Sequence, residues 1–370
     1  MPTAMVTSDE ARPPPSPATD VGNLSGTQPD LAFVATRVRP YLDRLLAGEQ
    51  ERWKELGAPW CDPVRTLGGF LSHGKALRPR FCFWGHAALA GDPGAGPLVA
   101  ACAALELLHA FALIHDDLMD ASGARRGRPS VHRDVAAAHA RLGWSGPADR
   151  YGAAVAMLTG DLAFALACRL AAALPEKAQP AWNELISELT AGQFLDLAGA
   201  ARTDRSAALA SLIARLKSGR YTVAGPLRLG AAIAGKQVPA GLSRYGELVG
   251  EAFQLRDDLL GVFGDAAVTG KPVGEDLQAG KSTLLLAYAS QRATGRQRAL
   301  LDRAGAGDLD EAEVSALTAL LEATGARARV EARITADVEE ALAALAVHEL
   351  PPGVAVPLRA LAWAAASRGI

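Results

Sequence analysis

Hydrophobic residues recur at three- and four-residue spacing through almost the whole chain from Leu31 onward, which is the period of an amphipathic α-helix. Alanine and leucine are abundant in these stretches, aromatic residues make up only 5% of the chain, and runs of β-branched residues are few, so the local helix propensity agrees with the pattern. The sequence predicts an all-α protein in which antiparallel helices of about 15 to 25 residues surround a central cavity that is open at one end.

Clusters of glycine and proline interrupt this pattern and mark the predicted helix ends. They fall at residues 57–63, 90–97, 122–130, 143–150, 235–239, 263–282, 305–308 and 350–357. Because none of them is a long linker and no fixed repeat is visible, we expect one large domain over residues 31–370. Residues 1–30 are rich in proline, serine, threonine and glycine and have no apolar signal-peptide core, which predicts a disordered tail.

The longest apolar stretch, residues 98–115, contains Glu106, His109 and His115. Polar residues at these positions favour a buried core helix over a membrane span, and we expect no transmembrane segment. With 49% hydrophobic and 21% charged residues the chain can bury a large core. Its net charge of -2 gives no overall field for nucleic acid or an anionic membrane surface, so we expect no nucleic-acid partner.

The cysteines give a weaker indication of the cellular compartment. Cys61, Cys82, Cys102 and Cys168 are scattered among apolar residues without CxxC spacing. This pattern is typical of reduced, buried thiols and predicts a cytoplasmic protein with no cysteine-bound metal.

A cluster of acidic residues is followed closely by two arginines in the segment LIHDDLMDASGARRGRP. On a helix Asp116 and Asp120 share one face and Asp117 flanks them. At about 6 Å the repulsion between two such carboxylates is about 3 kcal/mol at an effective dielectric constant of 20, and a hard divalent cation such as Mg²⁺ would reverse its sign. Arg125 and Arg126 would then bind phosphate groups. Taken alone, the segment is more typical of a solvated acidic helix end followed by a basic turn.

A second acidic pair occurs later in the chain. A solvated helix end therefore explains the first cluster less well. Asp257 and Asp258 lie in the helical segment GEAFQLRDDLLGVFGD, and the loop that follows carries Lys271 and Lys281. Two carboxylate pairs can face each other across one cavity. Further fragments suited to anions occur at SHGKALRPR, with Gly74, Lys75 and Arg78, and at RLKSGRYT, with Lys217.

These fragments, in this order, resemble the motifs of the polyprenyl synthetases, the head-to-tail trans-isoprenyl diphosphate synthases. The matched motifs extend from Gly74 to Lys281. The resemblance implies an isoprenoid synthase fold, a homodimeric enzyme, and a Mg²⁺-dependent condensation of isopentenyl diphosphate with allylic diphosphates by ionisation, 1'-4 addition and proton loss. No Ser-His-Asp or Cys-His arrangement is evident in the sequence, in agreement with a reaction that uses no protein nucleophile.

The resemblance also implies roles for individual residues. It implies that three Mg²⁺ ions are held by Asp116, Asp120 and Asp257, with Asp117 and Asp258 assisting through water or as outer partners. The allylic diphosphate would be bound by Arg125, Lys217, Gln254, Lys271 and Lys281. Isopentenyl diphosphate would be bound by Lys75, Arg78, His109 and Arg126.

Some of these residues would also suit an ordinary structural role: His109 is typical of a core histidine, and Lys281 of a solubilising residue at a helix start. Gln193 and Asp196, in the segment AGQFLDL, resemble another element of the family, and a pair on a helix surface is the alternative. The sequence also departs from the family pattern. Gly261 stands where the second cluster usually has a third aspartate, which predicts weaker Mg²⁺ binding there without loss of activity, and Ala76 replaces a basic residue.

Product length in such enzymes depends on the side chains just before the first aspartate. Here Phe111 and Ala112 occupy the positions five and four before Asp116. One aromatic, at the fifth position, resembles the enzymes that make geranylgeranyl diphosphate (C20), while a farnesyl (C15) or longer-chain product remains an alternative. Two other classes of protein also remain possible. A class I terpene cyclase would not need the second diphosphate pocket, and a non-catalytic partner subunit would be expected to lack metal-binding aspartates.

Overall fold

The structure is a computed structural model that describes residues 28–367 apart from 90, 93, 126, 265–273 and 348–349, and leaves the side chains of 58–62 undescribed. The predicted tail is therefore outside the described residues up to residue 27. Helix α1 (Pro29–Phe33) begins two residues before the predicted domain boundary at residue 31. Asp30, at the end of the predicted tail, is buried and accepts a hydrogen bond from Nε of Arg80 at 2.6 Å, so this ion pair fixes the start of the domain.

The described chain is almost entirely helical, which confirms the all-α prediction. The N-terminal half contains η1 (Val34–Val38), α2 (Arg39–Arg52), η2 (Lys54–Leu56), α3 (Ala58–Leu71), α4 (Leu77–Ala87), α5 (Gly96–Met119), α6 (Val131–Arg141) and α7 (Ala148–Ala172). The middle contains η3 (Glu176–Ala178), α8 (Gln179–Ala201), α9 (Ala207–Ile213), η4 (Ala214–Ala224), α10 (Gly225–Ile233) and α11 (Ala240–Phe263). The remainder contains α13 (Glu275–Gln278), α14 (Leu284–Arg292), α15 (Arg296–Asp302), α16 (Glu311–Ala323), α17 (Ala326–Ala346) and α18 (Pro352–Ala366).

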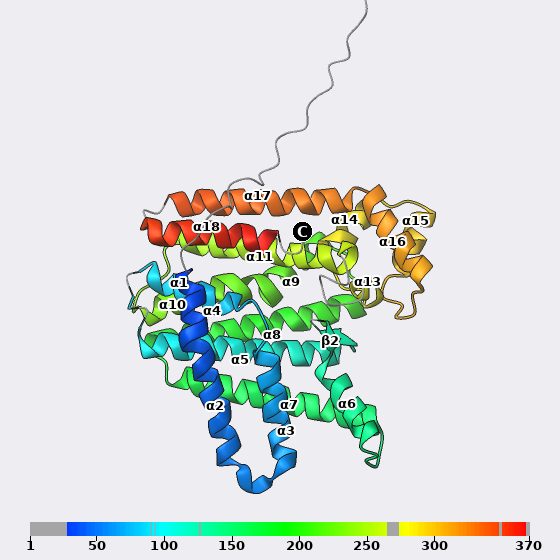
Figure 1. Ribbon diagram of the computed structural model, residues 1–370. Helices are drawn as coiled ribbons and strands as arrows, with labels where there is room; N and C mark the ends of the chain where they lie inside the picture. Colours follow the sequence, from blue (N-terminus) through cyan, green and yellow to red (C-terminus); the bar gives the residue numbers. More distant parts are fainter. Residues whose placement is uncertain are drawn as a thin grey trace, which may run out of the picture.

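The long helices form stacked layers (Figure 1). Helices α11, α17 and α18 lie together on one side, and α5, α7 and α8 on the other, with α11 packed on α17 and on η4, and α5 packed on α7. Within the described residues the extended structure is one antiparallel pair, β1 (Ala124–Arg125) and β2 (Arg128–Pro129). This pair follows α5 directly and turns the chain back toward the end of that helix.

Helix α5 contains the predicted apolar stretch and is the central core helix. Leu98, Leu105, Leu107 and Leu108 are fully buried, because α4, α7 and α10 pack around the helix. The prediction of a buried core helix over residues 98–115 is confirmed. Its C-terminal end, which carries the acidic cluster, is less buried and faces a cavity.

Two helices are long and apolar enough to cross a membrane by length and composition, α5 and α7. In α5, 61% of the most apolar window is buried inside the protein, and in α7 the buried share is 39%. Core helices of soluble proteins meet the same criterion, so this finding alone is weak support for a membrane span, and the absence of one stays a prediction.

Glycines bring η4 unusually close to two neighbouring helices. A Cβ atom on Gly192 of α8 would lie 2.3 Å from the backbone nitrogen of Lys217, and one on Gly250 of α11 would lie 2.4 Å from the carbonyl oxygen of Gly219. The segment η4 is itself π-helical, a rare geometry that is often found at functional sites. This close packing fixes the position of Lys217 between α8 and α11, and thereby in the cavity.

We expect Gly250→Ala to destabilise the protein by about 1–3 kcal/mol, the usual cost of overpacking. The added methyl group meets backbone atoms of Gly219, which cannot rotate away. Chemical denaturation of the variant and the wild type would measure the difference. Gly48→Ala in α2 is the matched control, because a Cβ there has no atom within 4 Å, and it should stabilise the helix by about 0.5–1 kcal/mol. Equal effects of the two substitutions would contradict the packing argument.

Candidate active site

A cavity of about 550 Å³ lies between α5, α8, η4, α11 and the segment around α13. Charged and polar residues from all of these elements line it together with apolar side chains. The lining includes Lys75, Arg78, Glu106, His109, Ala112, Leu113, Asp116, Arg125, Leu189, Gln193, Asp196, Lys217, Tyr221, Phe253, Gln254, Asp257, Asp258, Gly261, Asp276 and Lys281. Residues that are far apart in the sequence therefore meet at one site.

The first acidic cluster lies at the C-terminal end of α5. Asp116 accepts hydrogen bonds from Nζ of Lys217 at 3.0 Å, from Arg125 at 3.2 Å and from the amide of Gln193 at 3.2 Å. Burial opposes the ionisation of Asp116, but the charges of these two cations and of Lys281 outweigh it and hold the pKa of the carboxyl well below its ordinary value. Asp116 is thus ionised throughout the physiological pH range.

The other two aspartates of the cluster have different partners. Asp120 lies 2.8 Å from Nζ of Lys281. Asp117 is fully buried and accepts a hydrogen bond from Nε of Arg125 at 2.8 Å. The short β1–β2 hairpin carries Arg125 back onto α5, so Asp117 orients the guanidinium that also contacts Asp116.

The second acidic cluster lies on α11, on the opposite side of the cavity. Asp257 and Asp258 both line the cavity, as does Gln254 one turn earlier. The side-chain amide of Gln254, a predicted diphosphate ligand, donates a 2.6 Å hydrogen bond to Asp258. Burial raises the pKa of Asp258 to about 8, and the negative charges of Asp276, Asp257 and Asp196 add to the shift.

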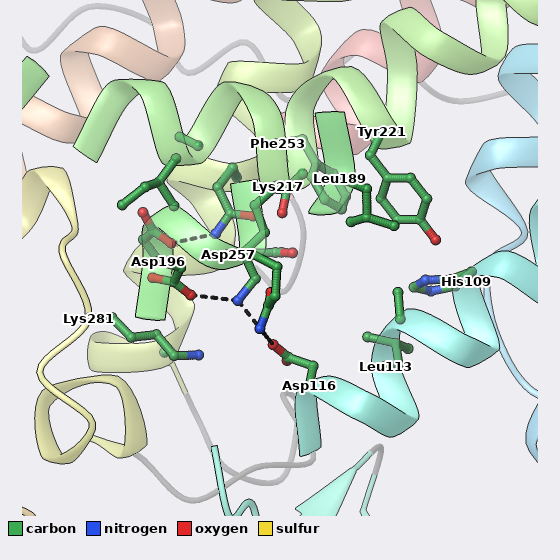
Figure 2. Close-up of a pocket in the computed structure, with 18 of the residues that line it drawn as sticks. His109, Leu113, Asp116, Leu189, Asp196, Lys217, Tyr221, Phe253, Asp257 and Lys281 are labelled. Atoms are coloured by element: carbon green, nitrogen blue, oxygen red, sulfur yellow. Dashed lines mark hydrogen bonds and ion pairs between the residues drawn. The ribbon is translucent and has the colours of Figure 1, made fainter. Parts of the chain in front are cut away.

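Two partly buried lysines connect the acidic residues. Lys217 donates hydrogen bonds to Asp116 and, at 2.6 Å, to Asp196 (Figure 2). Lys281 contacts Asp120 and, at 3.2 Å, Asp276. Burial disfavours the charge on each lysine, yet the surrounding carboxylates raise the pKa of both above the ordinary value. Lys281 is therefore a partly buried member of the site and not a solubilising surface residue.

Gln193 and Asp196 also belong to the cavity wall. The alternative of a pair on a helix surface is wrong, because Asp196 is only 6% exposed and pairs with Lys217, while Gln193 donates to Asp116.

A second group of polar residues lies beyond Asp116, along the same side of α5. Arg78 is buried, donates a 2.8 Å hydrogen bond to Thr222 and stacks over the ring of Tyr221 at 4.2 Å. His109 lies with its ring 6.2 Å from that of Tyr221 and lines the cavity (Figure 2). Lys75 is exposed at the cavity mouth. The structure thus brings three of the four predicted isopentenyl diphosphate residues together.

Ala112 and Leu113 form part of the apolar wall of the cavity. Phe111, the expected chain-length residue, points toward α7, where its ring lies 4.8 Å from that of Phe164 and 4.7 Å from the ring of His115.

The remaining predicted residues, Arg126 and Lys271, lie outside the described residues. Glu106, Tyr221 and Asp276 are among the cavity residues that were not predicted as functional. For Asp276 a signal is present in the sequence, since it precedes Lys281 by five positions in the loop that is predicted to bind phosphate. Glu106 and Tyr221 lie within helical patterns where nothing distinguishes them from ordinary core or surface positions.

The chemistry of these donors suits Mg²⁺. Within the part of the chain that the structure describes, no three His, Cys, Asp or Glu side chains converge closely enough to enclose a metal ion. Mg²⁺ does not need such a cage, because it commonly uses one or two carboxylates and completes its shell with water and substrate phosphates. Asp116, Asp120 and Asp257 offer carboxylate oxygens around one cavity that also contains cations for phosphate, so the site fits Mg²⁺ bound together with a diphosphate.

Comparison with known proteins identifies the fold and the family. The profile of the family described as polyprenyl synthetase matches residues 66–321. The chain belongs to this family. It is 33% identical over 299 residues to the (2E,6E)-farnesyl diphosphate synthase of Mycobacterium tuberculosis, covering 78% of each chain. It is 34% identical over 295 residues to the geranylgeranyl diphosphate synthase of the same organism, covering 77% of this chain and 78% of the relative.

Solved structures agree with this assignment. A geranylgeranyl pyrophosphate synthase from Corynebacterium glutamicum, crystallised with isoprenyl diphosphate and magnesium, superposes with a TM-score of 0.86 at 38% identity, covering 91% of this chain and 98% of that one. The chain is therefore a trans-isoprenyl diphosphate synthase with the isoprenoid synthase fold. The relatives include both farnesyl and geranylgeranyl synthases, so the family alone leaves the product length undecided.

The raised pKa of Asp258 predicts a pH dependence of stability in metal-free protein. A carboxyl with a higher pKa in the folded state contributes stability at about pH 4 and below, and loses it as the pH rises through about 8. In EDTA, the melting temperature of wild-type protein should fall over this range more steeply than that of Asp258→Asn, and the variant should melt higher at pH 8. Melting curves across the pH series measure this, and parallel profiles for the two proteins would contradict it.

Proposed function

We propose that this enzyme condenses isopentenyl diphosphate with allylic diphosphates and makes geranylgeranyl diphosphate. One observation carries the proposal. Two acidic clusters, on α5 and α11, line the same cavity as the cationic side chains of Arg125, Lys217 and Lys281. This arrangement provides for both the cations and the anions of a metal–diphosphate complex.

The two substrates would occupy different parts of the cavity. Asp116, Asp120 and Asp257 would hold Mg²⁺, three ions per active site, with Asp117 and Asp258 as outer partners. When bound, Mg²⁺ would neutralise charge on the departing diphosphate. Arg125, Lys217, Gln254, Lys271 and Lys281 would bind the allylic diphosphate. Lys75, Arg78, His109 and Arg126 would bind isopentenyl diphosphate.

The protein side chains would then act by binding and orientation. Lys217, Lys281 and Arg125 would stabilise the negative charge that develops as the allylic carbon–oxygen bond breaks. The group around Arg78 and His109 holds isopentenyl diphosphate so that its double bond can attack the allylic carbon. The apolar wall, with Leu113, Leu189 and Phe253, keeps water from the cation. The released diphosphate would accept the final proton, so no protein nucleophile is required.

The C20 product follows from the side chains before Asp116. Ala112 leaves room at the cavity wall, whereas Phe111 lies against Phe164 and braces the region between α5 and α7. A growing chain that passes Ala112 would be limited by this aromatic pair.

We also propose a homodimer that works in the cytoplasm. Helix α7 exposes an apolar stripe, with Tyr151 at 40%, Met157 at 54% and Leu158 at 63% exposure, which suits burial against a second copy. Free Cys82 and Cys102 are buried, in keeping with a reducing compartment.

The substitution Leu158→Glu should convert the dimer to a monomer, because it places a charge in the proposed apolar contact. Light scattering coupled to gel filtration measures the mass. Asp149→Asn, at a side chain that is 82% exposed on the same helix, is the control and should leave the mass unchanged. A monomeric wild-type protein would contradict the proposed homodimer.

The reaction can be tested directly with purified protein, Mg²⁺, isopentenyl diphosphate and, in separate reactions, dimethylallyl, geranyl or farnesyl diphosphate. Mass spectrometry should detect a C20 diphosphate. Ala112→Phe should shift the main product to C15 by narrowing the cavity wall, and Phe111→Ala should lengthen it beyond C20. Such steric discrimination is modest, on the order of 10- to 200-fold per group, so product mixtures are expected.

The same assay separates the alternatives. A C15 product from wild-type protein would keep the chemistry and overturn the chain-length proposal. Hydrocarbon released from an allylic diphosphate alone would indicate a class I terpene cyclase. No reaction with any allylic substrate would point to a non-catalytic partner subunit.

A further inference from the structure

Two consecutive residues of η4 hold the guanidinium of Arg78. One terminal nitrogen of Arg78 donates a 2.8 Å hydrogen bond to Oγ1 of Thr222, and Cζ of Arg78 lies 4.2 Å from the centre of the Tyr221 ring. The hydrogen bond fixes an edge of the guanidinium plane, and the ring supports its face. All three residues are buried, so both contacts form away from bulk water.

The contact with Tyr221 is between a cation and a neutral ring. Burial raises the pKa of Tyr221 well above its usual range, although the charge of Arg78 opposes this shift. The phenol is therefore neutral at physiological pH, and the face of its ring attracts the guanidinium. Together with the hydrogen bond from Arg78 to Thr222, this contact restricts a long side chain that would otherwise sample many rotamers.

The guanidinium of Arg78 keeps donors for a ligand. Arginine has five N–H donors, and the buried Nε of Arg78 has no hydrogen-bond partner among the described residues. Arg78 and Tyr221 line the active-site cavity, whereas the described atoms of Thr222 lie behind its wall. Thr222 can therefore affect a bound ligand only through the residues that it contacts.

Helix η4 also carries a cation at the charged end of the cavity. Lys217, five positions before Thr222, donates a 3.0 Å hydrogen bond to Asp116. Five positions is the hydrogen-bonding step of a π-helix, so the two residues lie on successive turns of η4. The close contacts of η4 with α8 and α11 at Gly192 and Gly250 therefore fix both residues together.

We propose that Thr222, supported by the ring of Tyr221, is a positioning residue that orients Arg78 toward isopentenyl diphosphate. Helix η4 then fixes one cation for each substrate, Lys217 for the allylic diphosphate and Arg78 for isopentenyl diphosphate. This inference rests on the proposed function, since it assumes that Arg78 binds isopentenyl diphosphate. It adds a residue that lies outside the cavity wall and acts through another side chain.

A simpler role for Thr222 would be to fill space between η4 and α4. The two roles predict opposite orders for two substitutions. Thr222→Val keeps the shape of the side chain and removes the acceptor of the hydrogen bond, whereas Thr222→Ser keeps the hydroxyl and removes a methyl group. If Thr222 orients Arg78, the valine variant binds isopentenyl diphosphate more weakly. If Thr222 only fills space, the serine variant is the more disturbed, because it leaves a cavity.

The test measures the KM of each substrate for the full chain with Mg²⁺, isopentenyl diphosphate and geranyl diphosphate. In Thr222→Val the KM for isopentenyl diphosphate should rise about tenfold, as expected when a hydrogen bond to a charged group is lost. The KM for geranyl diphosphate should change less than about twofold, because Lys217 is unaffected. Thr222→Ser should keep both KM values within about threefold of the wild type, since its hydroxyl still accepts from Arg78.

Thr159→Val is the matched control. Thr159 is also fully buried, but its hydroxyl donates a 2.8 Å hydrogen bond to the carbonyl of Val155 within α7. This substitution should leave both KM values unchanged. If Thr222→Val melts far below Thr159→Val, Thr222→Ala is compared with Thr222→Ser instead, because alanine also removes the acceptor.

Two further measurements connect the effect to Arg78. Without an allylic substrate, the concentration of isopentenyl diphosphate that gives half of the maximal rise in melting temperature should increase about tenfold in Thr222→Val. This measurement reports binding without chemistry. In protein that already carries Arg78→Met, Thr222→Val should change the KM for isopentenyl diphosphate less than about twofold, because residues that act through one contact are not additive.

Four results would overturn the inference. They are an unchanged KM for isopentenyl diphosphate in Thr222→Val, equal rises in the two KM values, a larger effect of Thr222→Ser than of Thr222→Val, and full additivity with Arg78→Met. If wild-type protein elongates geranyl diphosphate, each of these results rejects the role of Thr222 alone. A wild-type protein that neither elongates geranyl diphosphate nor responds to isopentenyl diphosphate would overturn the proposed function and this inference together.

Discussion

The balance of charge between partly buried carboxylates and lysines is the constraint on which the site depends. Asp116 pairs with Lys217, and Asp120 with Lys281. Each of these charged groups would be costly to bury without its partner. The helices that carry them therefore pack closely only when the opposite charges pair. The same charges give the cavity its chemistry, because carboxylates suit Mg²⁺ and ammonium groups suit diphosphate.

Helix packing decides whether these charges can meet. Lys217 reaches the cavity because Gly192 lets η4 approach α8, and Gly250 meets Gly219 where η4 contacts α11. The π-helical geometry of η4 belongs to the same arrangement. Small residues far from any reacting atom thus hold a cation of the site in place, which links the core of the bundle to the electrostatics of its cavity.

Two parts of the cavity would bind different parts of the substrates. The charged end, between α5 and α11, would bind diphosphates, and the apolar wall around Ala112 and Leu113 would receive the hydrocarbon chain. Because α5 carries both Asp116 and Ala112 one turn apart, under the proposed function the same helix would set the position of the reacting carbon and the depth available to the product. Family membership supports the position of the reacting carbon more firmly than the depth of the cavity, since a few side chains alter that depth.

The sequence by itself determined the all-α class, the core helix over residues 98–115 and most of the charged residues of the site, because helical periodicity and the spacing of aspartates are local properties. Only the tertiary structure placed Asp196 in the cavity and Gln254 on Asp258. It alone brought Asp276 against Gly261, since the distance between them depends on how a loop returns to α11. Such contacts join residues that no local period relates, and packing decides them.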